Sequence, residues 1–215
     1  MAIARDAASQ GNVALSSTSL TWSHTISGSN RGLFVGAKVY VANDVSATYN
    51  GVSMGAQVAS VLMSEAGGNY GVVWYLSNPD LGTHDIVISR SGGANHLSGA
   101  AVSFTGVKQT GQPANSATNT NSSNLSVTVA EDQSWLALFI SMQFPGYAQS
   151  DLGTSRAVIS GPPDFQYLHG MMERGPVGTG SQTIQTDYTA NSNGNLVIVL
   201  EPAGGDAPRF ILGTH

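Results

Sequence analysis

Apolar and polar residues alternate in short runs along most of the chain. In "SLTWSHTI", every second residue from Leu20 to Ile26 would face one side of a strand, and the residues between them would face the other. Runs of this kind recur at spacings of roughly ten residues, bounded by turn residues. They include "GLFVGAKVYV", "YGVVWYL", "THDIVIS", "LSGAAVSF", "SWLALFIS" and "NLVIVL". No window long enough for a helix shows the apolar period of one.

Turn signals separate these runs. Asn50-Gly51 predicts a type I′ hairpin, because both residues tolerate positive φ. The segments "NPDLG", "SGGAN" and "NSNG" also end strands. We therefore expect an all-β fold, an antiparallel β-sandwich of jelly-roll or immunoglobulin-like type with about twelve short strands.

The domain organisation depends on one polar segment. Residues 108–123, "KQTGQPANSATNTNSS", lack an apolar anchor and predict a long loop or inter-sheet crossover, with a domain boundary as the alternative. Strand patterns resume directly after it, and no internal repeat is visible in the sequence. We expect a single sandwich domain over residues 1–202 and an extended C-terminal tail over residues 203–215.

Composition narrows the partners. Charged residues make up 10% of the 215 residues, the net charge is −5, and no cluster of Lys or Arg occurs. Nucleic acids and acidic membranes are bound through such clusters, so we expect neither partner. The chain has no cysteine and therefore no disulfide. The start "MAIARDAASQGN" shows no signal sequence, which predicts a protein made in a cytoplasm.

One motif matches a catalytic pattern. "GVSMG" fits G-x-S-x-G, which would make Ser53 a nucleophile at a sharp strand-to-helix turn. Here the motif follows a hairpin signal, and the residues after it alternate as in a strand. We interpret Ser53 as a hairpin residue and expect no enzymatic activity.

Other reactive residues are dispersed. The five histidines show no metal-ligand spacing, and no two carboxylates stand out as a glycosidase pair. We expect no metal and no cofactor. Trp22, Trp74 and Trp135 lie inside apolar runs, which favours the core, although a platform for stacking on a carbohydrate is the alternative.

Several stretches together resemble a known family. They are "SLTWSHT", "TYNGVSM", "WYLSNPDLGTHDIVIS" and "AAVSFTGVKQT", and they cover about residues 18 to 110. They are similar to β-sandwich domains of tailed-bacteriophage virion proteins and related bacterial proteins. The resemblance implies a structural virion protein, assembled in the host cytoplasm, and brings no catalytic residues.

The expected function is decoration or cementing of a capsid through inter-subunit contacts, or else a place in a tail or fibre. Partners would be the major capsid protein or other virion subunits, with a homotrimer favoured. The alternative function is a carbohydrate-binding module of a phage fibre or bacterial surface protein.

The end of the chain carries the predicted partner-binding residues, Arg209, Phe210, Ile211 and Leu212. They follow the breaker-rich loop "PAGGDAP", and exposed apolar clusters favour association. Each apolar side chain contributes about 1.5–3 kcal/mol when buried, while ordering the backbone costs about 1–2 kcal/mol per residue. A modest clasp on another subunit is expected, with an extra edge strand or a plug on its own domain as the alternative.

A chain ending at Pro202 distinguishes these two interpretations. If the tail clasps another subunit, the shortened protein melts nearly as before but trimerises or decorates particles much less, as measured by sedimentation. Normal assembly of the shortened protein, or loss of its own fold, would contradict the clasp.

Overall fold

The computed structural model describes residues 1–63, 68–120, 122, 124–142, 149–150, 154–160, 168–187 and 193–204. Within these ranges the chain is all-β, with several antiparallel sheets, one 3-10 turn, η1 (Ala42–Asp44), and no α-helix. The expected all-β, sandwich-like architecture is thus confirmed. Strands in the described ranges run to β17, more than expected, because polar and very short segments also join sheets. Nothing in these ranges forms a helix long and apolar enough to span a membrane.

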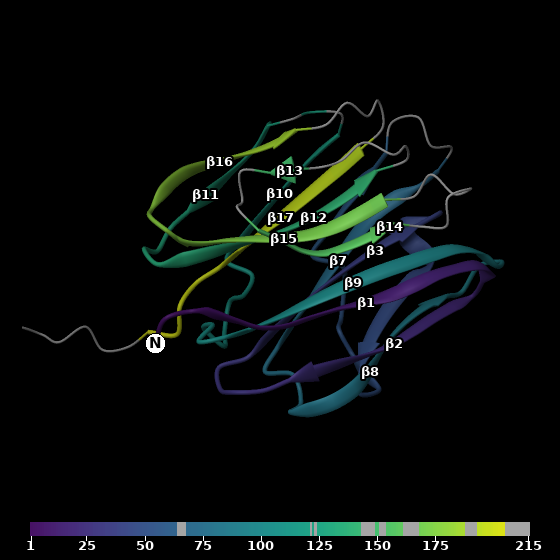
Figure 1. Ribbon diagram of the computed structural model, residues 1–215, viewed down its shortest axis with the longest axis horizontal. Helices are drawn as coiled ribbons and strands as arrows, with labels where there is room; N and C mark the ends of the chain where they lie inside the picture. Colours follow the sequence, from purple (N-terminus) through teal and green to yellow (C-terminus); the bar gives the residue numbers. More distant parts are fainter. Residues whose placement is uncertain are drawn as a thin grey trace, which may run out of the picture.

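The first half of the chain forms two sheets that face each other (Figure 1). The inner sheet has, in spatial order, β1 (Ala4–Ser17), β9 (Asn95–Thr105), β3 (Gly32–Val39), β7 (Tyr70–Ser77) and β6 (Ala59–Leu62). The outer sheet has, in the same sense, β2 (Ser19–Ile26), β8 (Gly82–Arg90), β4 (Val45–Tyr49) and β5 (Val52–Ser53).

The second half also forms an inner and an outer sheet. The inner sheet has, in order, β10 (Asn115–Thr120), β17 (Asn193–Leu200), β12 (Ser134–Met142), β15 (Leu168–Val177) and β14 (Thr154–Ser160). The outer sheet has β11 (Asn124–Val129), β16 (Gly180–Asp187) and β13 (Gln149–Ser150).

The two halves share one strand arrangement. The order β1-β9-β3-β7-β6 has its counterpart in β10-β17-β12-β15-β14, and β2-β8-β4 has its counterpart in β11-β16-β13. In each half the first strand therefore lies beside the last, and the second strand beside the one before last. The chain contains a structural duplication that its sequence does not display. That both halves form one cooperative domain stays a prediction.

The four sheets stack as layers, with an apolar core between each two neighbouring sheets. Among the described residues, one core lies between the two inner sheets and includes Phe34, Phe104, Phe139 and Leu196. The core of the first half includes Trp22, Tyr49 and Trp74. The core of the second half includes Leu125, Leu138 and Ile184.

Layer position explains the two kinds of strand pattern. Strand β2 alternates between exposed and buried residues, because one face meets the core and the other meets water. Every residue of β3 and of β17 is buried, because both faces of an inner sheet are covered. The runs "GLFVGAKV" and "NGNLVIVL" are mostly apolar on both faces for this reason, and Lys38, Asn193 and Asn195 are their buried polar residues.

Contacts between the inner sheets are reciprocal. The central strands β3 and β12 contact each other, β1 contacts β14 as β10 contacts β6, and β9 contacts β15 as β17 contacts β7. Contacts that exchange in this way are typical of a two-fold symmetric dimer interface. The halves therefore pack like two subunits of a dimer within one chain.

The two inner sheets pack against each other at an interface that we call the joint. Their close approach there depends on a glycine. A Cβ atom on Gly36 of β3 would lie 2.2 Å from Cδ2 of Phe139 on β12. The phenyl ring thus occupies the space above the glycine at the centre of the joint.

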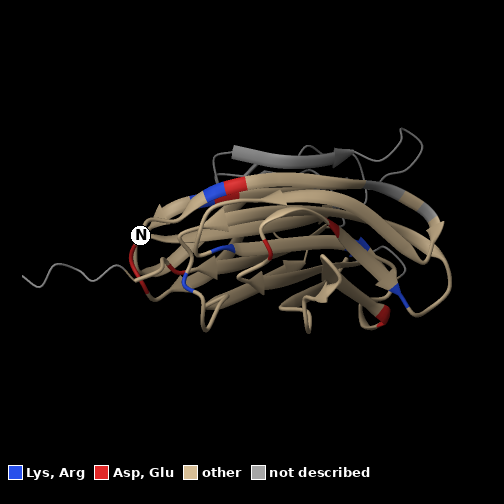
Figure 2. Ribbon diagram, turned by 90° about the horizontal axis from the view of Figure 1, so that it is seen from below, with Lys and Arg blue, Asp and Glu red and all other residues tan. Residues whose placement is uncertain are grey.

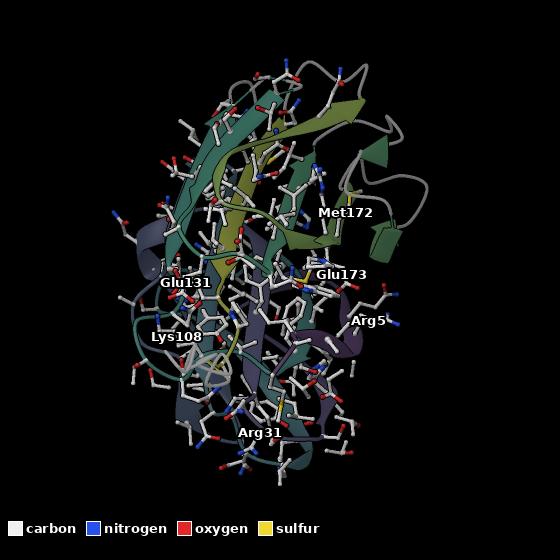
Figure 3. All side chains as sticks on the ribbon, turned by 90° about the vertical axis from the view of Figure 1, so that its left-hand side faces the viewer. Arg5, Arg31, Lys108, Glu131, Met172 and Glu173 are labelled. Atoms are coloured by element: carbon white, nitrogen blue, oxygen red, sulfur yellow. The ribbon has the colours of Figure 1, made fainter. Side chains whose placement is uncertain are left out.

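Polar contacts join the halves at the periphery. Arg5 Nε lies 3.7 Å from Oε1 of the buried Glu173 (Figure 3). In the segment that connects the halves, Lys108 Nζ lies 3.0 Å from carboxylate oxygens of both Glu201 and Glu131, and these hydrogen bonds raise the pKa of Lys108.

Two sequence predictions about connecting segments have different outcomes. The Asn50-Gly51 turn is confirmed, with φ of 50° and 73°. The prediction of a loop over residues 108–123 is wrong in part, because Asn115–Thr120 forms strand β10 and pairs with β17. This polar strand has an inconspicuous sequence because its residues are exposed or half-buried, with Ala117 packed on the core.

The start of the predicted tail belongs to the joint. Val107 and Pro202 form an antiparallel bridge, and Ala203 N donates to Gly106 O at 2.7 Å. A chain shortened after Gly204 keeps these contacts and is the better test of the tail. Residues 209–212 lie outside the described residues.

Substitution of Gly36 tests the joint. We expect Gly36→Ala to lower the free energy of unfolding by about 1–3 kcal/mol, because the added methyl group overpacks Phe139. The matched control is Gly93→Ala, where a Cβ atom meets nothing within 4 Å. Urea unfolding measures both changes. Phe139→Leu combined with Gly36→Ala should recover part of the loss, whereas simple additivity of the two changes would contradict direct contact.

Candidate functional site

The outward face of the sheet β2-β8-β4-β5 is covered with short hydroxyl side chains. Cross-strand pairing aligns Ser19 with Ser89 and Ser89 with Ser46. Neighbouring strands lie about 4.8 Å apart, and outward residues on one strand recur about every 6.8 Å. The face is therefore a regular grid made of Ser19, Thr21, Ser23, Thr25, Ser46, Thr48, Ser53, Thr83, Asp85, Val87 and Ser89. We call it the hydroxyl face.

Hydrogen bonds hold parts of this grid in place. Ser23 Oγ donates to Asp85 Oδ1 at 2.9 Å, and the hydroxyls of Thr25 and Thr83 lie 2.8 Å apart. Asp85 is the one ionisable residue among those that form the hydroxyl face. Charged residues are also sparse over the rest of the described chain (Figure 2).

Two shallow hollows lie along the neighbouring strands β4 and β8. The first has a volume of about 450 Å³ and is lined by Thr48, Asn50, Gly51, Thr83, His84, Asp85 and Val87. The second, of about 400 Å³, is lined by Asn43, Asp44, Val45, Ser46, Ser89, Arg90 and Ser91. Ser46 and Thr48 are successive outward residues of β4, so one hollow follows the other along the strand.

The hairpin after β4 forms the rim of the first hollow. Asn50 Nδ2 donates to Asp80 Oδ2 at 2.9 Å, and Asn50 N donates to Asp85 O at 3.0 Å. His84 Nε2 lies 2.9 Å from Leu81 O. These bonds fix the polar groups of the rim in position.

An ion pair underlies the second hollow. Arg90 Nη2 lies 2.6 Å from Asp44 Oδ2, and the Arg90 side chain is 4% exposed. Arg90 Nε also approaches both carboxylate oxygens of Asp44, at 3.3 and 3.2 Å. Since the charges neutralise each other, this hollow presents serine hydroxyls and an amide without net charge.

A serine and a histidine meet beneath the sheet. Ser9 Oγ on β1 lies 2.7 Å from Nδ1 of His24 on β2, and Trp22 Nε1 donates to Ser9 Oγ at 3.0 Å. At such a distance a histidine is able to accept a proton from a serine. His24 is 1% exposed, however, so a substrate has no path to its ring. We interpret the pair as a polar link between the two sheets of the first half.

Burial controls the charge of this histidine. Desolvation lowers the pKa of His24 from 6.5 to about 4, and the nearby Asp6 opposes the shift. Asp6 is itself held by Ser27 N and Ser103 Oγ, each donating to Oδ2 at 2.9 Å. His24 is therefore neutral at neutral pH, and the pair carries no net charge.

A buried lysine lies at the joint. Lys38 on the central strand β3 is 4% exposed, and desolvation lowers its pKa from 10.5 to about 7. Near neutral pH this side chain is therefore uncharged in a larger fraction of molecules than a surface lysine.

Ser53, the candidate nucleophile of the sequence, lies in the hairpin of β4 and β5. Ser53 is an exposed hairpin residue on β5, and its Oγ accepts from Gly55 N at 3.1 Å, which agrees with its interpretation as structural. Within the described part of the chain, no three His, Cys, Asp or Glu side chains gather where they would hold a metal ion.

The tryptophans belong to the cores. Trp74 is fully buried and Trp22 is 8% exposed. Trp135 is half-buried and meets Phe104 edge-on, with ring centroids 6.1 Å apart. The core interpretation is confirmed for Trp22 and Trp74, and a stacking platform built from these two rings is excluded.

Sequence reasoning missed the hydroxyl face and the hollows. A signal for the face was present in "SLTWSHTI", where the residues opposite the apolar side are all Ser or Thr. The Asp44–Arg90 pair joins the turn η1 to strand β8, far apart in the chain, and leaves no such signal. Comparison of the chain with protein-family models, curated proteins and solved structures finds no match.

The pKa of His24 predicts a pH dependence of stability. An unfolded histidine takes up a proton near pH 6.5, whereas the folded one does so near pH 4. Protonation therefore favours the unfolded chain, so the free energy of unfolding decreases as the pH falls from 6.5 through 4. The total decrease is about 3 kcal/mol.

Urea unfolding at pH 7, 5.5 and 4.5 measures this loss. His24→Gln should remove it from the pH profile, while His84→Gln, at a half-exposed site, should keep it. Equal pH profiles for the wild type and His24→Gln would show that His24 does not carry the effect.

Proposed function

We propose that the chain is a structural virion protein that decorates a capsid or belongs to a tail or fibre, and that it works through contacts between subunits. The major capsid protein or other virion subunits would be its partners, and a homotrimer would suit a three-fold position. It would act by binding rather than by catalysis.

The duplicated strand order is the structural observation that supports this proposal. In each half the first strand pairs with the last and the second with the one before last, which supports a jelly-roll assignment. Jelly rolls build viral capsid and lectin domains. A fold alone does not decide function, so the choice of a virion rests on the motifs, such as "SLTWSHT" and "TYNGVSM", that resemble virion domains.

The stacking of the halves fits a load-bearing role. Three apolar cores follow one another through the described layers, so the sheets support each other across the whole stack. Close-packed interiors of this kind resist deformation. Such a body suits a protein that reinforces a shell.

Analysis of particles tests the proposal. In virions purified from the phage or prophage that encodes the chain, we expect the protein to co-sediment in a fixed ratio to the major capsid protein. Immunoblots of gradient fractions measure this ratio. Particles lacking the protein should bind it when the purified chain is added back. Its absence from purified particles, together with failure to bind them, would reject the proposal.

A further inference from the structure

The two hollows succeed one another along the hydroxyl face, and together we call them the track. Both follow β4 and β8, where Ser46 pairs with Ser89 and Thr48 with Val87. From Thr83 to Ser91 the track runs over nine residues, or roughly 26 Å of strand. This shape fits a long, thin ligand lying along the strands better than a compact one.

The side chains along the track include both hydrogen-bond donors and hydrogen-bond acceptors. Ser and Thr hydroxyls both donate and accept, the Asn50 amide does the same, and the Asp85 carboxylate accepts. Among the described residues Asp85 Oδ1 is bonded to Ser23, and Oδ2 makes no hydrogen bond. Sugar hydroxyls likewise donate and accept, so a polyhydroxylated chain satisfies both kinds of group.

The charge of the track selects a neutral ligand. Asp85 leaves one exposed negative charge, and the Asp44–Arg90 pair at the other end is neutralised. A polyanion would find no unpaired cation among the lining residues. Val87 and the methyl groups of Thr48 and Thr83 add a small apolar floor for the C–H face of a sugar ring, as ligand sites combine apolar walls with a few polar groups.

A protein partner suits the track less well. Cores of protein interfaces are enriched in aromatic residues, Met and Arg. The lining residues are instead mostly Ser, Thr, Asn and Asp, and Arg90 is buried. This composition suits a repeating polymer, which offers many hydrogen-bonding groups that each contribute weakly.

We propose that the paired hollows of β4 and β8, with Thr48, Asn50, Asp85, Ser46 and Ser89, bind a neutral polysaccharide chain in an extended conformation. This binding site is independent of the proposed virion role, because a carbohydrate can be bound with or without attachment to a particle.

Affinity electrophoresis of the intact protein tests this site. Gels contain a soluble mixed-linkage β-glucan, a galactomannan or dextran, and alginate serves as the acidic polymer. We expect at least one neutral polymer to retard the protein, and alginate not to.

Two isosteric variants locate the binding site, Thr48→Val and Asp85→Asn. Thr48→Val removes a hydroxyl group, and Asp85→Asn replaces one carboxylate oxygen acceptor with an amide donor. Each should weaken binding about threefold to tenfold, as expected for one lost hydrogen bond. Thr183→Val, on the exposed face of β16 in the other outer sheet, makes the same change as Thr48→Val and should bind as the wild type does. Thermal melting confirms that each variant is folded.

Three results would overturn the proposal. They are no retardation by any neutral polymer, equal retardation of the wild type and both track variants, and retardation by alginate alone. Self-association that Thr48→Val or Asp85→Asn abolishes would assign the face to a second copy of the chain instead. Failure here leaves particle binding unaffected, and the converse holds too, so the two proposals are tested separately.

Discussion

The packing of the two inner sheets against each other is the interaction on which the rest of the structure depends. It buries β3 and β17 on both faces and fixes which sheets remain outside. Because the central strands of the inner sheets are covered on both faces, the regular solvent-exposed strand faces among the described residues lie on the outer sheets, as on β2. The hydroxyl face is exposed because the two halves pack through their inner sheets and not through this outer sheet.

The sequence was informative where one strand face meets water. Alternation in "SLTWSHTI" identified the buried side of β2 and its polar side, although not the part that the polar side has in the candidate site. The Asn50-Gly51 turn was equally clear, because its backbone requires residues that accept positive φ. Local chemistry determined these features, and local patterns showed them.

Long-range features were not readable in the same way. Strand β10 is polar and became visible only through its pairing with β17. The duplication is a property of strand order, which different side chains can support equally well. The hollows also require β4 and β8 to lie side by side, although their paired residues Ser46 and Ser89 are far apart in the chain. Pairing between distant segments decides all three.

The contact between Gly36 and Phe139 has a meaning for how such a molecule can arise. In a symmetric dimer of identical subunits, a residue on the two-fold axis faces its own copy, so at the axis a phenyl ring would meet a phenyl ring and a glycine a glycine. Fusing both copies into one chain removes this constraint, since each position can then change alone. The ring of one half fills the space left by the other, a complementarity that identical partners cannot achieve at their symmetry axis.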